Sequence, residues 1–98
     1  MSLSNSQLRH LRGLGHALKP VVAIAGKGLS DTVMAELEIA LDHHELIKVR
    51  ISADDREARD AFIETLLSRT HAEKVQRVGH VLTVFRRNPR EPRVELPR

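Results

Sequence analysis

The fold is decided by one stretch of the sequence, Val21-Val-Ala-Ile-Ala-Gly-Lys-Gly-Leu-Ser-Asp-Thr-Val-Met-Ala-Glu-Leu-Glu38. It begins with a continuous apolar run, typical of a strand that is buried on both faces. A glycine-flanked lysine follows, and Ser30 is a preferred N-cap for the amphipathic helix that comes next. A helix start carries unpaired N–H groups and a partial positive charge, and glycine lets a phosphate approach the backbone. The stretch therefore predicts a strand, a phosphate-binding loop and a helix.

The flanking sequence predicts two more helices and three more strands. Their expected ranges are a helix over about 5–17 with a capping box at Ser4 and Gln7, a strand over 46–52, a helix from Asp54 to about Thr70, and a hairpin of strands 74–78 and 81–86 around Gly79-His80. Within the strand at 46–52, Lys48 and Arg50 face away from the three apolar residues that alternate with them.

The resulting order is helix, strand, helix, strand, helix, strand, strand. Each strand–helix–strand step favours a parallel pair of strands, and the hairpin adds an antiparallel edge. We therefore expect a compact α/β domain with a mixed four-stranded sheet over residues 1–87, and an extended Pro- and Arg-rich tail over residues 88–98.

Composition narrows the functional classes. The chain has 98 residues, enough for one core, with 41% hydrophobic and 30% charged residues. It has no cysteine, no secretory signal pattern and no apolar run of membrane-spanning length, so we expect a soluble, cytoplasmic protein that does not bind membranes, most simply a monomer. There is no Trp or Tyr and only two Phe, which disfavours an RNA reader built on stacked bases.

The net charge of +3 is unevenly distributed. Residues 1–30 carry four basic groups and no acid, residues 31–85 carry seven basic and eleven acidic groups, and residues 86–98 carry five arginines and two glutamates. Basic ends around an acidic middle make a dipolar molecule with one surface suited to a polyanion.

The chain resembles the CRM domain, the chloroplast RNA splicing and ribosome maturation module, in its stand-alone bacterial YhbY form. The resemblance covers nearly the whole sequence and rests on Leu11-Arg-Gly-Leu-Gly-His-Ala-Leu-Lys-Pro-Val-Val22, Gly28-Leu-Ser30, His43-His-Glu-Leu-Ile-Lys-Val49 and Leu96-Pro-Arg98. It implies a fold similar to the C-terminal domain of translation initiation factor three, with a loop like the GxxG clamp of KH domains. It also implies RNA binding on precursors of the large ribosomal subunit, without a catalytic site.

One position departs from the family pattern. The loop tetrad is Ala25-Gly26-Lys27-Gly28, so alanine replaces the first glycine. The added methyl group is harmless if Ala25 has a negative φ, whereas a positive φ would reshape the loop. We expect the harmless case, because Ala25 is placed at the end of the strand.

The expected RNA-binding residues fall into two groups. The loop backbone holds a phosphate, and cationic side chains surround it. The full set is Ala25, Gly26, Lys27, Gly28, Leu29, Arg9, Arg12, Lys19, Lys48, Arg50, Arg86 and Arg87. The remaining arginines of the tail form either a further RNA-binding arm or a solubilising segment. Phosphate contacts of this kind give affinity rather than base reading.

Other chemistries lack a sequence anchor. A mononucleotide loop of the form GxxxxGK[ST] fails at both ends around Lys27, and the histidine spacing does not suit a metal ion. No nucleophile elbow or clustered acid–base pair appears. We expect no catalytic residues, metal, cofactor or small-molecule substrate. The alternatives that stay open are a protein-interaction module whose RNA contact is incidental, a phosphate-dependent enzyme and a DNA-binding domain.

Overall fold

The computed structural model describes residues 2–25 and 28–98. Its elements are α1 (Asn5–Gly15), β1 (Pro20–Ile24), α2 (Asp31–His44), β2 (Leu46–Ile51), α3 (Arg56–Thr70), β3 (Glu73–Val78) and β4 (Val81–Phe85). This order and the mixed four-stranded sheet confirm the fold class predicted from the sequence. None of the helices in the described ranges has the length and apolarity needed to cross a membrane.

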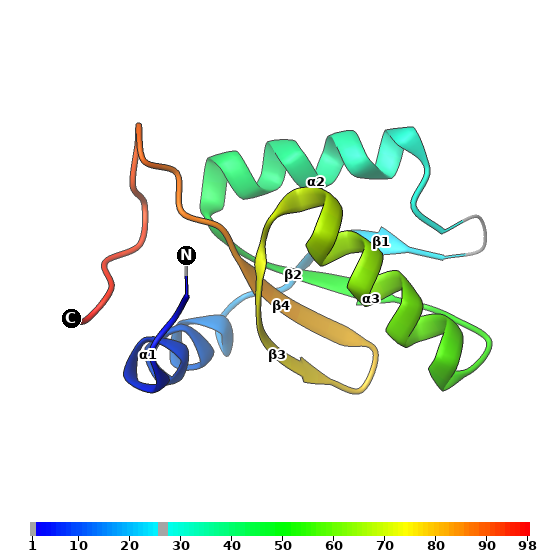
Figure 1. Ribbon diagram of the computed structural model, residues 1–98, viewed down its shortest axis with the longest axis horizontal. Helices are drawn as coiled ribbons and strands as arrows, with labels where there is room; N and C mark the ends of the chain where they lie inside the picture. The colour runs from blue at the N-terminus through cyan, green and yellow to red at the C-terminus, as the bar shows by residue number, and fades with distance from the viewer. Residues whose placement is uncertain (1, 26–27) are drawn as a thin grey trace.

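The strands lie in the order β1-β2-β4-β3. The pair β1 and β2 is parallel, and β4 pairs antiparallel with both β2 and β3. The second strand of the hairpin therefore inserts beside β2, which leaves β1 and β3 as the two edges of the sheet (Figure 1).

The main core lies between one face of the sheet and helices α2 and α3. Alternation along β2 turns Ile47, Val49 and Ile51 toward these helices, as the sequence pattern predicts. Leu37 from α2 and Leu66 from α3 are fully buried against them. The α2–α3 face of the sheet is therefore closed by packing.

The opposite face is only half covered. Helix α1 packs over one end of it, where Leu11 forms a second cluster with Leu46, Val75 and Phe85. The chain end lies beside α1, where Val94 and Leu96 pack on the same cluster, and Figure 1 shows both termini on that side of the molecule. The rest of this face, at the end of β2 and the start of β4, is not covered by α1.

Local capping explains where the helices begin. Ser4 and Gln7 form the predicted capping box, and the Ser30 hydroxyl accepts a hydrogen bond from the Val33 N–H at 3.2 Å. The predicted start of α3 at Asp54 is wrong by one residue. Asp55 is the N-cap, because its carboxylate accepts from the Ala58 N–H at 2.8 Å.

The prediction that the first strand is buried on both faces is also wrong. Burial alternates along β1, and Val21 is 53% exposed. An unbroken apolar run does not by itself say whether both faces are covered. Here β1 is an edge strand, and α1 covers the second face of the sheet only at its other end.

Candidate nucleic-acid interface

The loop between β1 and α2 is fixed on its far side by Gly28. This residue is buried with φ +72°, and a Cβ atom added to it would lie 2.9 Å from Phe62 Cε1. Both the backbone angle and the close approach of the ring require glycine. The Gly28 N–H donates to the Ala25 carbonyl at 3.0 Å, which ties the start of α2 to the end of β1. Gly26 and Lys27, the centre of the predicted phosphate clamp, lie outside the described residues.

Ala25 replaces a family glycine without a backbone penalty. Within the described parts of the chain, positive φ angles at non-glycine residues occur only at Glu45 and His71. Ala25 is also exposed, so its side chain is not part of the packed core. The harmless case expected from the sequence is thus the one that the backbone adopts.

The start of α2 has fewer groups available to bind a phosphate than the sequence pattern suggests. The Ser30 N–H donates to the Gly28 carbonyl, and the Ser30 hydroxyl already accepts the Val33 N–H. Asp31 places a carboxylate in the first turn, where it offsets the positive end of the helix dipole. Positive charge for an anion must therefore come mainly from side chains.

Five cationic side chains belong to the half-covered face of the sheet: Arg9, Arg12, Lys19, Lys48 and Arg50, called here the basic surface. Lys48 and Arg50 alternate with the core residues of β2 and so point to this side. In the sheet register Pro20 is the partner of Lys48, and Ala23 is the partner of Arg50. The basic surface therefore runs along β2 beside the edge strand β1.

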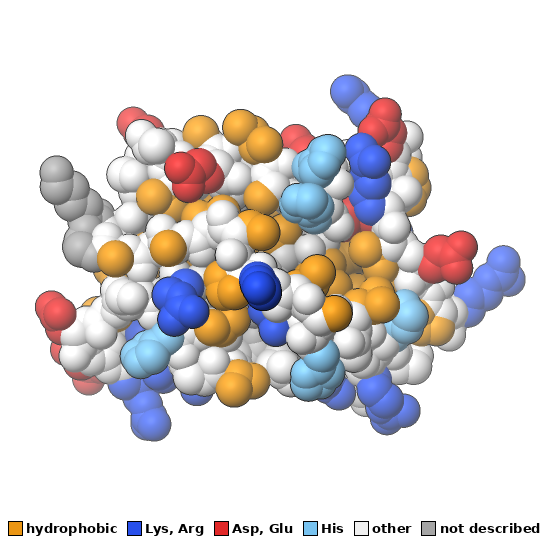
Figure 2. All heavy atoms as spheres, turned by 180° about the vertical axis from the view of Figure 1, so that it is seen from behind, with side chains coloured by type: hydrophobic (Ala, Val, Ile, Leu, Met, Phe, Trp, Pro, Cys, Tyr) orange, Lys and Arg blue, Asp and Glu red, His pale blue; other side chains and the backbone are white. Residues whose placement is uncertain are grey.

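Helix α1 brings the remaining charges to the same side. Gly15 lies over the sheet, where an added Cβ would be 3.9 Å from Lys48 Cε. Arg9 and Arg12 are three residues apart on α1, so they are neighbours on its surface. Lys19 directly precedes β1 and is exposed. In Figure 2 the centre of the face seen from behind carries Lys and Arg side chains among hydrophobic ones, and acidic side chains lie toward its periphery.

A shallow hollow lies within the basic surface. Its volume is about 240 Å³, and its lining includes Lys48, Arg50, Gln76 and Thr83 beside the apolar side chains of Val78 and Val81. Cations at one end and neutral polar groups across the floor suit a sugar-phosphate backbone.

The cations of the basic surface make no ion pair with another described residue. Within residues 2–25 and 28–98, the ion pairs involve Arg59, Arg86, Arg87 and Arg93, and none of the five. Helix α2, on the opposite side of the sheet, carries four carboxylates and no Lys or Arg. The basic surface therefore lies on the side of the sheet opposite the acidic α2, while α3, on the same side as α2, carries three arginines and three carboxylates.

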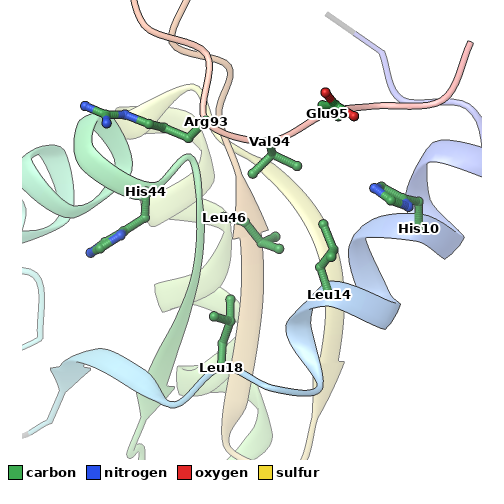
Figure 3. A pocket seen from close by; sticks show the side chains of 8 residues that line it. All are labelled: His10, Leu14, Leu18, His44, Leu46, Arg93, Val94 and Glu95. Atoms are coloured by element: carbon green, nitrogen blue, oxygen red, sulfur yellow. The ribbon is translucent and has the colours of Figure 1, made fainter.

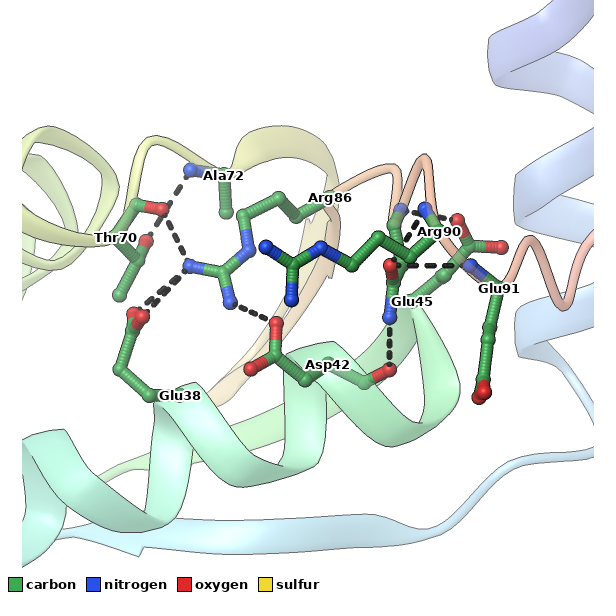
Figure 4. A network of polar contacts seen from close by, with 9 residues as sticks. Glu38, Asp42, Glu45, Thr70, Ala72, Arg86, Arg90 and Glu91 are labelled. Carbon is green, nitrogen blue, oxygen red and sulfur yellow. Dashed lines mark hydrogen bonds and ion pairs between the residues drawn. The ribbon is translucent and has the colours of Figure 1, made fainter.

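Arg86 and Arg87 lie away from the basic surface and are already paired. Figure 4 shows the Arg86 guanidinium between Thr70 and two carboxylates of α2. Its Nη1 donates to Glu38 at 2.8 Å and to the Thr70 carbonyl at 2.9 Å, and its Nη2 donates to Asp42 at 2.9 Å. Arg87 donates to Glu45 at 3.1 Å. Their predicted contact with RNA stays a prediction, but these contacts show that both join the tail and β4 to α2.

Glu45 is the residue that the sequence reasoning passed over. It ends α2 with φ +63°, and its side chain is fully buried. Its Oε1 accepts the N–H groups of Arg93 at 2.6 Å and Val94 at 2.8 Å, and its Oε2 accepts that of Asn88 at 2.5 Å. The predicted extended tail is thus fastened to the body. The sequence hints at this role of Glu45 only by placing a single charged residue between the end of a helix and a buried strand.

The surroundings of Glu45 set its charge state. Burial is the largest influence and raises the pKa of this carboxyl, but the backbone N–H groups of Asn88, Arg93 and Val94, with the Arg87 guanidinium, together outweigh it. The pKa of Glu45 is therefore lowered, and the group is ionised at neutral pH. A buried carboxylate that accepts several N–H groups is a strong fastening point.

Comparisons with known proteins agree with this fold. A family model, the CRS1 / YhbY (CRM) domain, matches residues 3–86. A Haemophilus influenzae protein named "RNA-binding protein" is 44% identical over 97 residues, covering 99% of this chain and 97% of the relative. A Pseudomonas aeruginosa protein named "Probable RNA-binding protein" is 40% identical over 90 residues, covering 92% of this chain and 86% of the relative.

A solved structure is similar over the full length. The solution structure of a Staphylococcus aureus protein matches with a TM-score of 0.82 and 29% identity, covering 98% of this chain and 100% of that one. The family match, the two relatives and this structure all span the helices and strands that carry the basic surface. The chain belongs to the CRS1/YhbY (CRM) domain family.

Proposed function

We propose that this protein binds RNA through the basic surface and the adjoining loop at residues 25–29, and that the RNA is part of a precursor of the large ribosomal subunit. The observation that carries the proposal is the basic surface, whose five cations make no ion pair within residues 2–25 and 28–98 and lie on the side of the sheet opposite the acidic α2. The names of the two bacterial relatives support RNA as the polyanion. The resemblance to stand-alone bacterial members of the family supports the ribosomal precursor.

The chemistry of this surface favours the backbone and shape of folded RNA. Among the described residues, Phe62 and Phe85 are half-buried and buried within the fold, so neither presents an open ring to a base. Lys and Arg contacts to phosphates neutralise charge and release counterions. Neutralising about five phosphates gives a slope of log K against log salt of about −3.5 to −4.5.

The test is the salt dependence of binding to a folded ribosomal RNA fragment, measured by fluorescence anisotropy. Neutralising two cations in the variant Lys48→Gln/Arg50→Gln should weaken binding and make the slope shallower by about 1.4–1.8. The matched control is Arg56→Gln/Arg69→Gln, which removes the same charge from exposed positions on α3. We expect the control to keep the slope of the unchanged protein.

Two results would refute this interface. Equal slopes for both double variants would mean that net charge, rather than the basic surface, drives binding. A binding constant that does not change with salt would exclude phosphate neutralisation altogether.

The ribosomal assignment needs a separate experiment. Lysate containing the tagged protein is sedimented through sucrose gradients at low and high salt. We expect comigration with large-subunit precursors at low salt, loss of that comigration at high salt, and its absence for Lys48→Gln/Arg50→Gln. Residence at the top of the gradient under both conditions would favour a protein partner instead.

A further inference from the structure

A second, larger hollow lies between α1, the start of β2 and the fastened tail. Its volume is about 500 Å³, within the range of about 300–1,000 Å³ that is usual for small-ligand pockets. Figure 3 shows the apolar side chains of Leu14, Leu18, Leu46 and Val94 pointing toward one another, with His10 reaching toward them from α1. His44 and Arg93 close the opposite side with their polar ends turned outward.

Two features of the fold create this pocket. The apolar stripe of α1 extends beyond the core, so Leu14 and Leu18 remain 42% and 37% exposed although Leu11 is fully buried. The tail forms the other wall, because Glu45 holds the backbone of Arg93 and Val94 in place. Neither the end of the α1 stripe nor the buried carboxylate is needed to close the main core.

We propose that this pocket takes a single unstacked nucleobase of the RNA bound on the basic surface. The proposal rests on the proposed function and adds a base contact to it. The flat apolar faces of a base fit between leucine and valine side chains, and the ring of His10 can stack on it. The Glu95 carboxylate at the rim can accept a hydrogen bond from an amino or imino group of the base edge.

The position of the pocket matches a base rather than an isolated ligand. Arg93 lines the pocket itself, and Leu18, another lining residue, directly precedes Lys19. A strand whose phosphates contact Lys19 or Arg93 therefore passes the mouth of the pocket, within reach of one splayed nucleotide. The positive charge beside the mouth complements the RNA backbone, and the apolar interior complements the base.

The test compares two oligomers of the same length, a single-stranded RNA hexamer and a sugar-phosphate hexamer without bases. The full-length protein should bind the RNA hexamer more tightly, by about 5- to 150-fold, which corresponds to about 1–3 kcal/mol for one stacked base. Leu14→Gln should shrink this difference. Ile39→Gln is the matched control, because Ile39 is an exposed apolar residue on α2 away from the pocket.

A second pair of variants guards against misfolding. His10→Ala removes an exposed ring at the pocket, and His16→Ala removes an exposed ring at the end of α1 that does not line it. We expect only His10→Ala to weaken binding of the base-bearing oligomer, with the melting temperature unchanged in both. In NMR spectra of the unchanged protein, the His10 imidazole signals should shift with the RNA hexamer and stay in place with the base-free one.

The outcomes separate this proposal from the proposed function. Equal affinity for both hexamers, with no effect of Leu14→Gln or His10→Ala while folded RNA still binds in a salt-dependent way, would overturn the base pocket alone. This result would also be expected if the pocket held a protein side chain. Loss of all binding to folded RNA and to both hexamers would overturn the proposed function as well.

Discussion

Replacing Glu45 by glutamine tests how the tail is fastened. The change keeps the shape of the side chain but removes its charge and one of its two acceptor oxygens. In the structure Oε1 accepts the Arg93 and Val94 N–H groups and Oε2 accepts that of Asn88. A glutamine amide must turn its NH₂ group toward one of these sets, where a donor then faces a donor.

The size of the effect follows from these contacts. Hydrogen bonds to charged groups contribute about 1.5–3 kcal/mol each, and the variant loses at least one and weakens the others. Because the site is fully buried, water cannot replace the lost acceptor. We expect the free energy of unfolding at pH 7 to fall by about 2–4 kcal/mol. At about 4–8 °C per kcal/mol for a domain of this size, the melting temperature should fall by about 8–32 °C.

The assay is urea unfolding at pH 7, together with hydrogen exchange at the three amides. The protection of the Asn88, Arg93 and Val94 N–H groups should drop sharply in Glu45→Gln. The control Glu91→Gln makes the same chemical change at a carboxylate that is 69% exposed and also pairs with Arg93. We expect it to cost less than about 1 kcal/mol, as surface pairs do. A loss of less than about 1 kcal/mol in Glu45→Gln would refute this account of the tail.

Three further predictions follow from other contacts. The pKa of Glu45 is lowered in the folded protein, so the stabilisation from its ionised carboxylate is complete above the unfolded-state pKa of about 4.3. This stabilisation is lost as the pH falls through the folded-state pKa. The difference in unfolding free energy between the unchanged protein and Glu45→Gln should therefore close in urea titrations below about pH 4. Gly28→Ala should destabilise the fold by about 1–3 kcal/mol in thermal melts, since it combines a positive φ with a clash against Phe62, and an unaltered melting temperature would contradict this packing. Arg86→Met should lower the free energy of unfolding by about 1–3 kcal/mol, because Glu38 and the Thr70 carbonyl lose their donor. It should leave the salt dependence of RNA binding unchanged. A shallower slope would mean that Arg86 contacts RNA.

The local signals in this chain are strong enough to give the order of its elements. Ser4, Ser30 and Gly79 act through caps and a turn that need only a few neighbouring residues, so their positions could be read directly. The alternation in β2 likewise assigns Lys48 and Arg50 to the side opposite the core, because strand geometry alone fixes that relation. The same local logic placed the basic residues of α1 in a segment without acids.

The exposure of individual residues and the pairing of charges depend on long-range packing, that is, on which distant segments come into contact. Val21 is exposed since β1 lies at an edge, and an apolar run has the same appearance in either place. The sequence could not show that Arg86 pairs with two carboxylates of α2, which lie 44 and 48 residues away. Nor could it show that Glu45 binds the backbone of a tail more than 40 residues downstream. The pocket beside α1 arises from the same fastening. Local patterns therefore predict the elements, the family and the distribution of charge, whereas the packing of distant segments shows which arginines pair with carboxylates, as Arg86 and Arg87 do.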